Sequence, residues 1–173
     1  MNRSQSTNRR NATGADRAGY LIATGFGAGF VPIAPGTVGA IQGASIFLAI
    51  HLLKLEQASS LVLLAVINII LFVVGVWASN RTCDMTAAAD PHIIVIDEVS
   101  GQLIALTPVA FLRFSWAAVI VGFLLFRLFD ILKPYPIRRL ERLHQGLGVM
   151  ADDALAGIYA GALLWGGLLL GLL

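Results

Sequence analysis

Carboxylates stand beside or inside apolar stretches at three places in this sequence. The pair Asp97 and Glu98 follows the apolar run Ile93–Ile96, and the pair Asp152 and Asp153 comes directly before the last apolar run. A charged side chain inside an apolar helix costs roughly 2.5–3.5 kcal/mol on membrane-insertion scales unless it finds a partner. These acids are therefore candidates for a functional site, although a pair of this kind could also only cap a helix.

The third place, FRLFDILKPYP, carries residue types that bind phosphate as well as metal. Arg127, Asp130 and Lys133 are spaced three residues apart, so they form one polar stripe on a helix. Arginine and lysine suit phosphate groups, and carboxylates are the ligands that Mg²⁺ prefers, often shared with a substrate phosphate. A metal can also activate water, so these residues indicate a metal-assisted phosphoryl reaction on a membrane-borne substrate. A row of ion pairs that only anchors the helix is the alternative.

A glycine-rich segment, TGFGAGFVPIAPGTVGA at 24–40, could complete such a site. Its glycines permit unusual backbone angles and close approach, and Pro35, Gly36 and Thr37 lead into an apolar run whose first amide groups could receive an anion. The segment lacks the Gly-Lys-Ser/Thr ending of a Walker loop and does not follow a strand as a Rossmann loop does. Taken alone, it is better explained as a segment that packs closely against helices.

The elements that must position these residues are apolar helices. The chain has 173 residues, of which 57% are hydrophobic and 13% charged, and its mean hydropathy is +0.80. Globular proteins average about 25% charged residues, so the composition predicts an all-α, polytopic membrane protein. The single cysteine, Cys83, excludes a disulfide framework. The basic pI of 9.0 is explained by topology signals, and we expect no nucleic-acid partner.

We predict about five transmembrane helices, because a span needs about 20 apolar residues. A glycine-rich re-entrant or interfacial loop is expected at 20–35, and residues 1–19 are expected to be a disordered cytoplasmic tail before one membrane domain at 20–173. The predicted spans are 37–53, 60–78, 93–112, 115–132 and 154–173.

Local signals predict where two of the helices begin and leave one short stretch open. Asp90 and Pro91 read as the N-cap and the first residue of a helix, which would put Asp97 about 9 Å along it. One residue of the pair at 152–153 is expected to serve the N-terminus of the last helix, leaving the other free to bind a metal. The stretch IRRLERL at 137–143 is either a short amphipathic interfacial helix or a solvated charged loop.

The charges fix the orientation of these spans. With a cytoplasmic N-terminus, only Lys54 and Arg113 of the twelve Lys and Arg residues fall in outer loops, as the positive-inside rule requires. Nine of the ten acids also fall on the inner side, Glu56 being the exception. The third, fourth and fifth spans would therefore bring their acids to one level at the cytoplasmic face.

The motifs TGFGAGFVPIAPGTVGA, IVIDEVSGQ, FRLFDILKPYPI and GLGVMADDALAG, in this order and spacing, resemble those of phosphatidylglycerophosphatase A. The resemblance covers about residues 20–173. It implies a Mg²⁺-dependent, multi-pass lipid phosphatase of the bacterial inner membrane, with its site on the cytoplasmic side. The implied reaction converts phosphatidylglycerophosphate to phosphatidylglycerol and inorganic phosphate.

The resemblance also implies which residues form the site. The implied metal ligands are Asp97, Glu98, Asp130, Asp152 and Asp153. Catalytic roles fall to four of these acids, namely Asp97, Glu98, Asp130 and Asp153. The implied substrate-binding residues are Gly36, Thr37, Arg127, Lys133 and Arg138. Ala28 and Ala40 stand where many members of the family have serine, so we expect no hydroxyl role at either position.

Two questions stay open at the level of sequence. The nucleophile is either an aspartate or a water activated by the metal; we favour the water, with Asp97 or Asp130 as the base. The same acids could instead form the transit site of a divalent-cation transporter or belong to a non-catalytic membrane scaffold. The sequence gives no indication of the oligomeric state.

Overall fold

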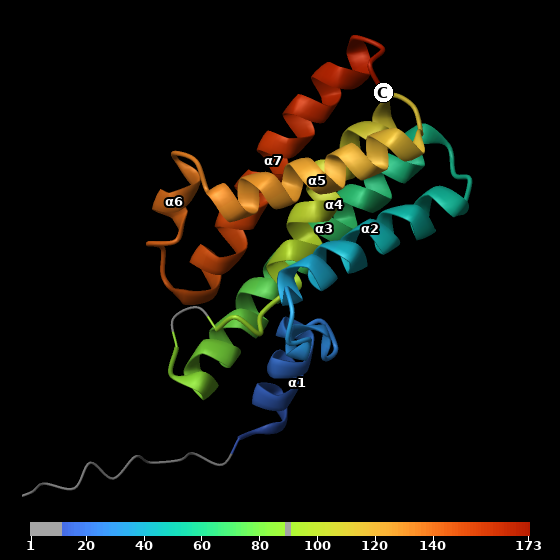
Figure 1. Cartoon of the computed structure of the whole chain (residues 1–173). Coiled ribbons are helices and arrows are strands. Elements are labelled where there is room, and N and C mark those ends of the chain that lie inside the picture. Colours follow the sequence, from blue (N-terminus) through green and yellow to red (C-terminus); the bar gives the residue numbers. More distant parts are fainter. Residues whose placement is uncertain (1–11, 89–90) are drawn as a thin grey trace, which may run out of the picture.

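The computed structural model describes residues 12–88 and 91–173, and every regular element in this part of the chain is a helix (Figure 1). This agrees with the predicted all-α fold. The elements are α1 (Gly14–Ala23), the short 3₁₀-helix η1 (Ala28–Phe30), α2 (Pro35–Leu52), α3 (Gln57–Thr86), α4 (Ile96–Phe111), α5 (Trp116–Leu132), α6 (Ile137–Leu140) and α7 (Gln145–Leu169).

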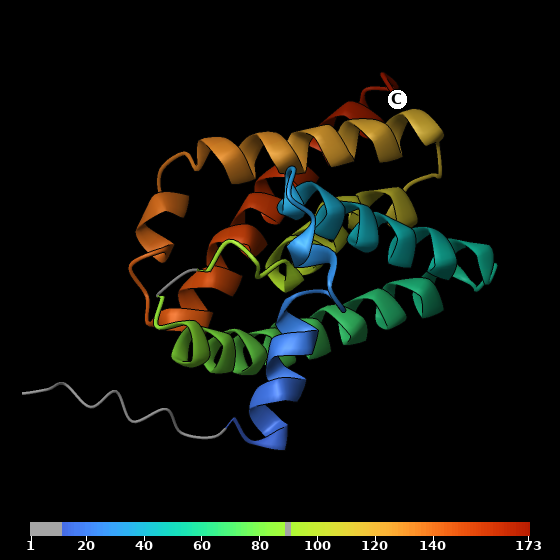
Figure 2. The same cartoon turned by 60° about the horizontal axis from the view of Figure 1, so that its bottom comes forward.

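The bundle is built around α4, which packs against α7, α2 and α3, while α5 lies mainly on α7. Figures 1 and 2 show that α2, α4 and α7 start at one end of the bundle and that α3 and α5 return to it. We call this the acidic end, because α4, α5 and α7 carry their acids there. The connections at 53–56 and 112–115 lie at the opposite end, the far end. Between the two ends the core is filled by fully buried Phe47, Leu103, Leu106, Phe126 and Leu164.

Among the residues that the structure describes, three helices are by length and composition apolar enough to cross a membrane: α2, α3 and α7. The sequence predicted about five, so the prediction was too high by this measure. The two remaining predicted spans form α4, with 16 residues, and α5, with 17. At 1.5 Å per residue these helices are about 24–26 Å long, short of the roughly 30 Å apolar thickness of a bilayer. The helix α3, with 30 residues, is much longer than predicted.

The predicted start of α4 was wrong. Asp90 lies outside the described residues, and Pro91 precedes the helix, which begins only at Ile96. The reason is a tertiary contact: the amide of Val95 donates to the carbonyl of Ala23 at 2.9 Å, which holds the segment before α4 against the end of α1. Asp97 and Glu98 consequently lie in the first turn of α4 rather than deep along it.

The start of α7 also differs from the prediction. The helix begins at Gln145, so Asp152 and Asp153 lie about two turns inside it and neither caps it. Here the early start is stabilised by a side chain from another helix, since the amide of Gly146 donates to Asn80 Oδ1 at 2.8 Å. Both acids are buried, with exposed fractions of 4% for Asp152 and 3% for Asp153.

The irregular segment predicted at 20–35 is present but shorter. Residues 24–34 form turns and η1, whereas α1 continues to Ala23. Residues 14–19, assigned to the tail from sequence, are the first part of α1, where Thr13 and Asp16 form a capping box. The rest of the predicted tail lies largely outside the described residues. The stretch predicted at 137–143 is helical only as α6.

Candidate active site

Two glycines set the distance between the helices that carry the acids. A Cβ atom on Gly157 of α7 would lie 2.3 Å from the carbonyl oxygen of Gly101 in α4, so only hydrogen at these positions allows the two backbones to touch. Asp97 and Asp153 each lie four residues, about one turn, before one of these glycines. Because α4 and α7 run in the same direction (Figure 1), the crossing brings the two acids to the same level.

Three carboxylates meet at this level. Oxygen atoms of Asp97, Glu98 and Asp153 all lie within 4.8 Å of one another. Glu98 Oε2 and Asp153 Oδ2 are buried and have no hydrogen-bond partner among the described residues. A buried polar atom normally has a partner, and clustered carboxylates repel one another. The group therefore fits a hard divalent cation, which prefers oxygen ligands of this kind.

A fourth carboxylate, Asp130, lies beside the three and is paired with an arginine. Arg127 Nη1 lies 2.5 Å from Asp130 Oδ2 and 3.9 Å from Glu98 Oε1. Arg127 and Asp130 belong to α5. This helix is capped at its start by Ser115 and runs back to the acidic end. Gly36, the second residue of α2, makes room for the contact between Arg127 and Glu98. A Cβ atom at this position would lie 2.0 Å from Glu98 Oε1 and 3.0 Å from Arg127 Nη1.

The fifth carboxylate, Asp152, binds a lysine. Lys133 ends α5 with a left-handed backbone (φ 43°) directly before Pro134. Its Nζ lies 2.5 Å from Asp152 Oδ2 and 2.9 Å from Glu141 Oε1. Burial alone lowers the pKa of Lys133, but the hydrogen bond and charge of Asp152, together with the bond to Glu141, raise it above its ordinary value. The lysine is thus a protonated link between α5, α7 and the segment after α6.

These residues surround a cavity of about 340 Å³. All of the predicted site residues line it except Thr37, which is half-buried nearby, and Arg138, which is exposed. The predicted residues in its wall are Gly36, Asp97, Glu98, Arg127, Asp130, Lys133, Asp152 and Asp153.

Other residues of the site were missed from sequence. Glu141 was read only as part of an amphipathic pattern, because nothing in the sequence shows that the turn after Lys133 brings it back to that lysine. Glu141 contacts Lys133, whereas exposed Ile131 and His92 line the cavity itself. The position of Ile131, one turn after Arg127 on α5, was a signal that could have been used. The further lining residues are Ala34, Pro35, Pro91, Ile94 and Val149.

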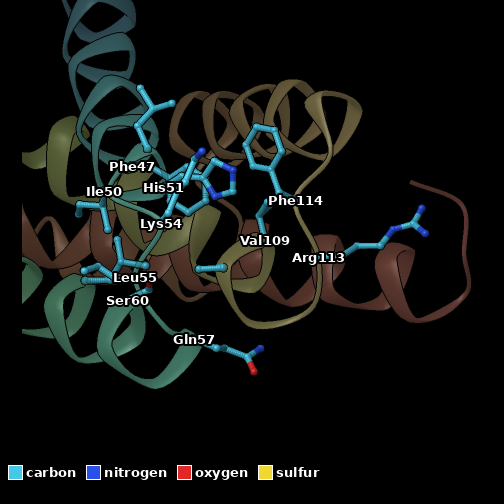
Figure 3. Close-up of a pocket in the computed structure, with 13 residues that line it drawn as sticks. Phe47, Ile50, His51, Lys54, Leu55, Gln57, Ser60, Val109, Arg113 and Phe114 are labelled. Carbon is cyan, nitrogen blue, oxygen red and sulfur yellow. The ribbon is translucent and has the colours of Figure 1, made fainter.

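A second cavity, of about 320 Å³, lies at the far end (Figure 3). Its wall is apolar where it meets the core, at Phe47, Ile50 and Val109. Figure 3 shows the side chains of Gln57 and Arg113 pointing away from these residues; Gln57 donates to the carbonyl of Phe111 and Arg113 to that of Leu173. No acid is found among the described residues that line this cavity, so they offer no comparable set of carboxylate ligands.

Comparison with known proteins gives a consistent family. Residues 21–168 match the profile of the family phosphatidylglycerophosphatase A. The chain is 38% identical over 142 residues to phosphatidylglycerophosphatase A of Haemophilus influenzae, covering 82% of this chain and 83% of the relative. It is 34% identical over 147 residues to phosphatidylglycerophosphatase A of Escherichia coli, covering 84% and 81%.

A further relative carries a different name. It is a protein of Bacteroides thetaiotaomicron, provisionally named a phosphatidylinositol-3-phosphatase, to which the chain is 42% identical over 141 residues, covering 81% of this chain and 87% of the relative. No solved structure matches the chain significantly. All three names are those of phosphatases, but two of them refer to phosphatidylglycerophosphate and the third to a phosphatidylinositol phosphate.

Proposed function

The chain belongs to the phosphatidylglycerophosphatase A family and is a phosphatase, and on that premise we propose that it hydrolyses phosphatidylglycerophosphate to phosphatidylglycerol and inorganic phosphate. The observation that carries this proposal is the cavity at the acidic end, in which carboxylates from α4 and α7 face a cation from α5. Those are the groups that a metal-assisted attack on a phosphomonoester requires.

Mg²⁺ is the cofactor that suits the site. Asp97, Glu98 and Asp153 would hold it, because their oxygens converge and two of those oxygens have no partner among the described residues. When bound, the ion supplies positive charge that offsets the charge of the phosphate and stabilises the charge that develops during its transfer. Asp130 and Asp152 are paired with Arg127 and Lys133, so we assign them roles beside the metal rather than on it.

The residues of the chain then divide the remaining work. Arg127 binds a phosphate oxygen and orients the group, since its guanidinium lies in the cavity wall beside Glu98 and Asp130. A water attacks phosphorus in line, and Asp130 accepts its proton, because this acid lies outside the trio and is oriented by Arg127. The new bond joins the water oxygen to phosphorus, and the bond from phosphorus to the glycerol oxygen breaks. That oxygen takes up the proton that Asp130 accepted, which gives phosphatidylglycerol and inorganic phosphate.

The substrate is a membrane lipid, and we propose that the enzyme is a multi-pass protein of the bacterial inner membrane. Three apolar helices support a membrane location. We propose that α4 and α5, which pack among them, complete a five-helix membrane domain whose acidic end faces the cytoplasm. An impermeant thiol reagent should then label Lys54→Cys in intact cells without permeabilising the inner membrane, and should label Arg139→Cys only after lysis. The reverse labelling would overturn the orientation.

One relative favours a second candidate substrate, phosphatidylinositol 3-phosphate. It also is a lipid phosphomonoester, so the same site chemistry would serve, but its phosphate is attached to a ring hydroxyl. Cation transport is not favoured, because fully buried Leu103, Leu106 and Phe126 fill the core between the two cavities.

The test is phosphate release by the purified protein in detergent. We expect release from phosphatidylglycerophosphate with Mg²⁺, a stop on addition of EDTA, and recovery when Mg²⁺ is restored in excess. Phosphatidylinositol 3-phosphate is assayed in parallel at equal surface concentration. Faster release from the inositol lipid would replace the proposed substrate, and release that is unaffected by EDTA would overturn the metal assignment.

A further inference from the structure

Different segments contribute exposed residues to the wall of the cavity at the acidic end. Exposed His92 belongs to the segment before α4. One side of the cavity is formed by the start of α2 and the end of α5, where Ala34 and Ile131 line it while remaining exposed. Ile131 is 70% exposed, although it is a large apolar residue. An apolar side chain that lines a charged cavity and is also exposed on the outer surface lies at the boundary between the polar cavity and the apolar surface of the helix.

The helices α2 and α5 leave this side open because each packs mainly on another partner. The main contacts of α2 are with α4, and those of α5 are with α7. The two helices approach each other where Gly36 allows Arg127 to come close. Ile131 lies four residues after Arg127, so it projects from the same face of α5, one turn nearer the end of the bundle.

An exposed apolar stripe continues from this side of the cavity along α5. Ile120, Leu124 and Leu128 follow one another at intervals of four residues and are 58%, 59% and 48% exposed. In a helix such spacing places side chains in one row. In a membrane protein an exposed apolar row of this kind faces lipid, so the lipid-facing surface of α5 runs without interruption to the cavity.

We propose that the opening between the start of α2 and the end of α5 is the portal for the glycerol and upper acyl chains of the lipid substrate, with Ile131 as a specificity-determining residue. This inference rests on the proposed function. The phosphate would lie at the carboxylates and Arg127, while the first methylenes of the acyl chains pass over Ile131 into the bilayer. The occupant is a diacyl lipid because a charged pocket continuous with a lipid-facing row matches a charged headgroup joined to apolar chains.

The portal makes a prediction about substrate preference. A diacyl phosphomonoester gains contact with Ile131, whereas the same headgroup without acyl chains does not. Truncating an apolar side chain in a binding site lowers the preference for the apolar ligand by about tenfold. The loss should therefore appear in the ratio of kcat/KM for phosphatidylglycerophosphate to kcat/KM for glycerophosphoglycerophosphate, its water-soluble deacylated counterpart.

The experiment compares Ile131→Ser with Ile120→Ser in detergent micelles. The two isoleucines are on the same helix, eleven residues or about three turns apart, with similar exposure. We expect the ratio to fall about tenfold in Ile131→Ser and to match the wild type in Ile120→Ser. Ile131→Val, which removes a single methylene and keeps the fold, should give an intermediate ratio.

The outcomes separate this inference from the proposed function. If the wild type hydrolyses the diacyl lipid but Ile131→Ser and Ile131→Val keep the wild-type ratio, the portal is wrong and the proposed function stands. A wild type that shows no preference for the diacyl lipid also overturns the portal. If the wild type hydrolyses neither compound, the proposed function fails and the portal with it.

Discussion

The two ends of the bundle contain cavities of nearly equal volume, about 340 Å³ at the acidic end and about 320 Å³ at the far end, yet their walls differ in kind. At the acidic end, carboxylates from three helices line the cavity, and Glu98 Oε2 and Asp153 Oδ2 have no hydrogen-bond partner in the described part of the chain. At the far end, the polar side chains of Arg113 and Gln57 turn outward and bond to backbone carbonyls (Figure 3). Cavity size therefore does not identify the site.

The difference follows from the free energy of burying charge. Placing several carboxylates together in a partly buried wall is unfavourable unless a ligand or a cation compensates. Nothing in the packing of α4 on α7 requires acids at 97 and 153, because the contact itself is made by Gly101 and Gly157. The far end shows the ordinary solution, in which polar groups find protein partners and the buried wall is apolar. Matched substitutions at the two ends turn this contrast into measurements.

The largest difference between the two ends should appear when one glutamate at each end is replaced by glutamine. Glu98→Gln removes a negative charge from the trio, so we expect phosphate release to fall by about 100-fold or more. Glu56→Gln makes the same chemical change at the far end, where Glu56 is exposed, and should alter the rate by no more than about twofold. The measurement is kcat/KM in detergent with saturating Mg²⁺. Equal rates for the two variants would remove the distinction between the ends.

A smaller loss of activity is expected from a glycine substitution at the acidic end, compared with a control glycine on α7. Gly36→Ala places a methyl group 2.0 Å from Glu98 Oε1, so Glu98 and Arg127 must shift. Displacing groups of a reaction site by about 1 Å can lower the rate as much as 100-fold, and we expect a loss of about 10-fold to 100-fold. Gly166→Ala, on α7 beyond the core, meets no atom within 4 Å and serves as the control. Near-wild-type activity of Gly36→Ala would show that this close approach is dispensable.

The third comparison concerns two lysines, whose substitution is expected to change mainly the stability of the protein. Lys133→Met leaves Asp152, which is 4% exposed, without its cation. Because Lys133 itself is partly exposed, we expect a loss of about 1–3 kcal/mol rather than the full cost of breaking a buried ion pair. Lys54→Met, at the exposed far end, should change stability by less than about 0.5 kcal/mol. Thermal unfolding in detergent would measure both, and equal melting temperatures would show that the link from α5 to α7 is not structural.

The smallest effect is expected at the far-end cavity itself. His51 stacks on Phe114 with ring centroids 4.0 Å apart. His51→Ala should lower stability by about 0.5–1.5 kcal/mol, the range for such ring pairs, and leave kcat/KM for the lipid unchanged. A loss of activity larger than the loss of folded protein would mean that the far end takes part in the reaction, contrary to the contrast drawn above.

Much of the acidic end could be predicted from sequence because charge is costly in an apolar chain. Acids at 97, 98, 130, 152 and 153 stood out against their neighbours, and the positive-inside rule put them on one side. Their convergence on one cavity is what the structure shows. The apolar runs likewise identified the five longest helices, α2, α3, α4, α5 and α7. They did not identify α1, which was predicted as part of the tail and of the irregular loop.

The remaining features depend on contacts between distant residues. The first turn of α4 is fixed by the bond from Val95 to Ala23, and the start of α7 is stabilised by Asn80. Sequence signals for capping could not anticipate either. The division of the five acids into a trio and two ion pairs was not predictable for the same reason, because it depends on where Arg127 and Lys133 end up.

The most direct test of the central claim is metal binding measured without turnover. Mn²⁺, a paramagnetic substitute for Mg²⁺, can be titrated into the purified protein and its free fraction followed by electron paramagnetic resonance. We expect the wild type and Glu56→Gln to bind Mn²⁺ at a site from which Mg²⁺ displaces it. In Asp153→Asn, we expect the affinity for Mn²⁺ to be weakened about 10-fold to 100-fold or more. Circular dichroism verifies that this variant is folded. An unchanged Mn²⁺ affinity in folded Asp153→Asn would contradict the account.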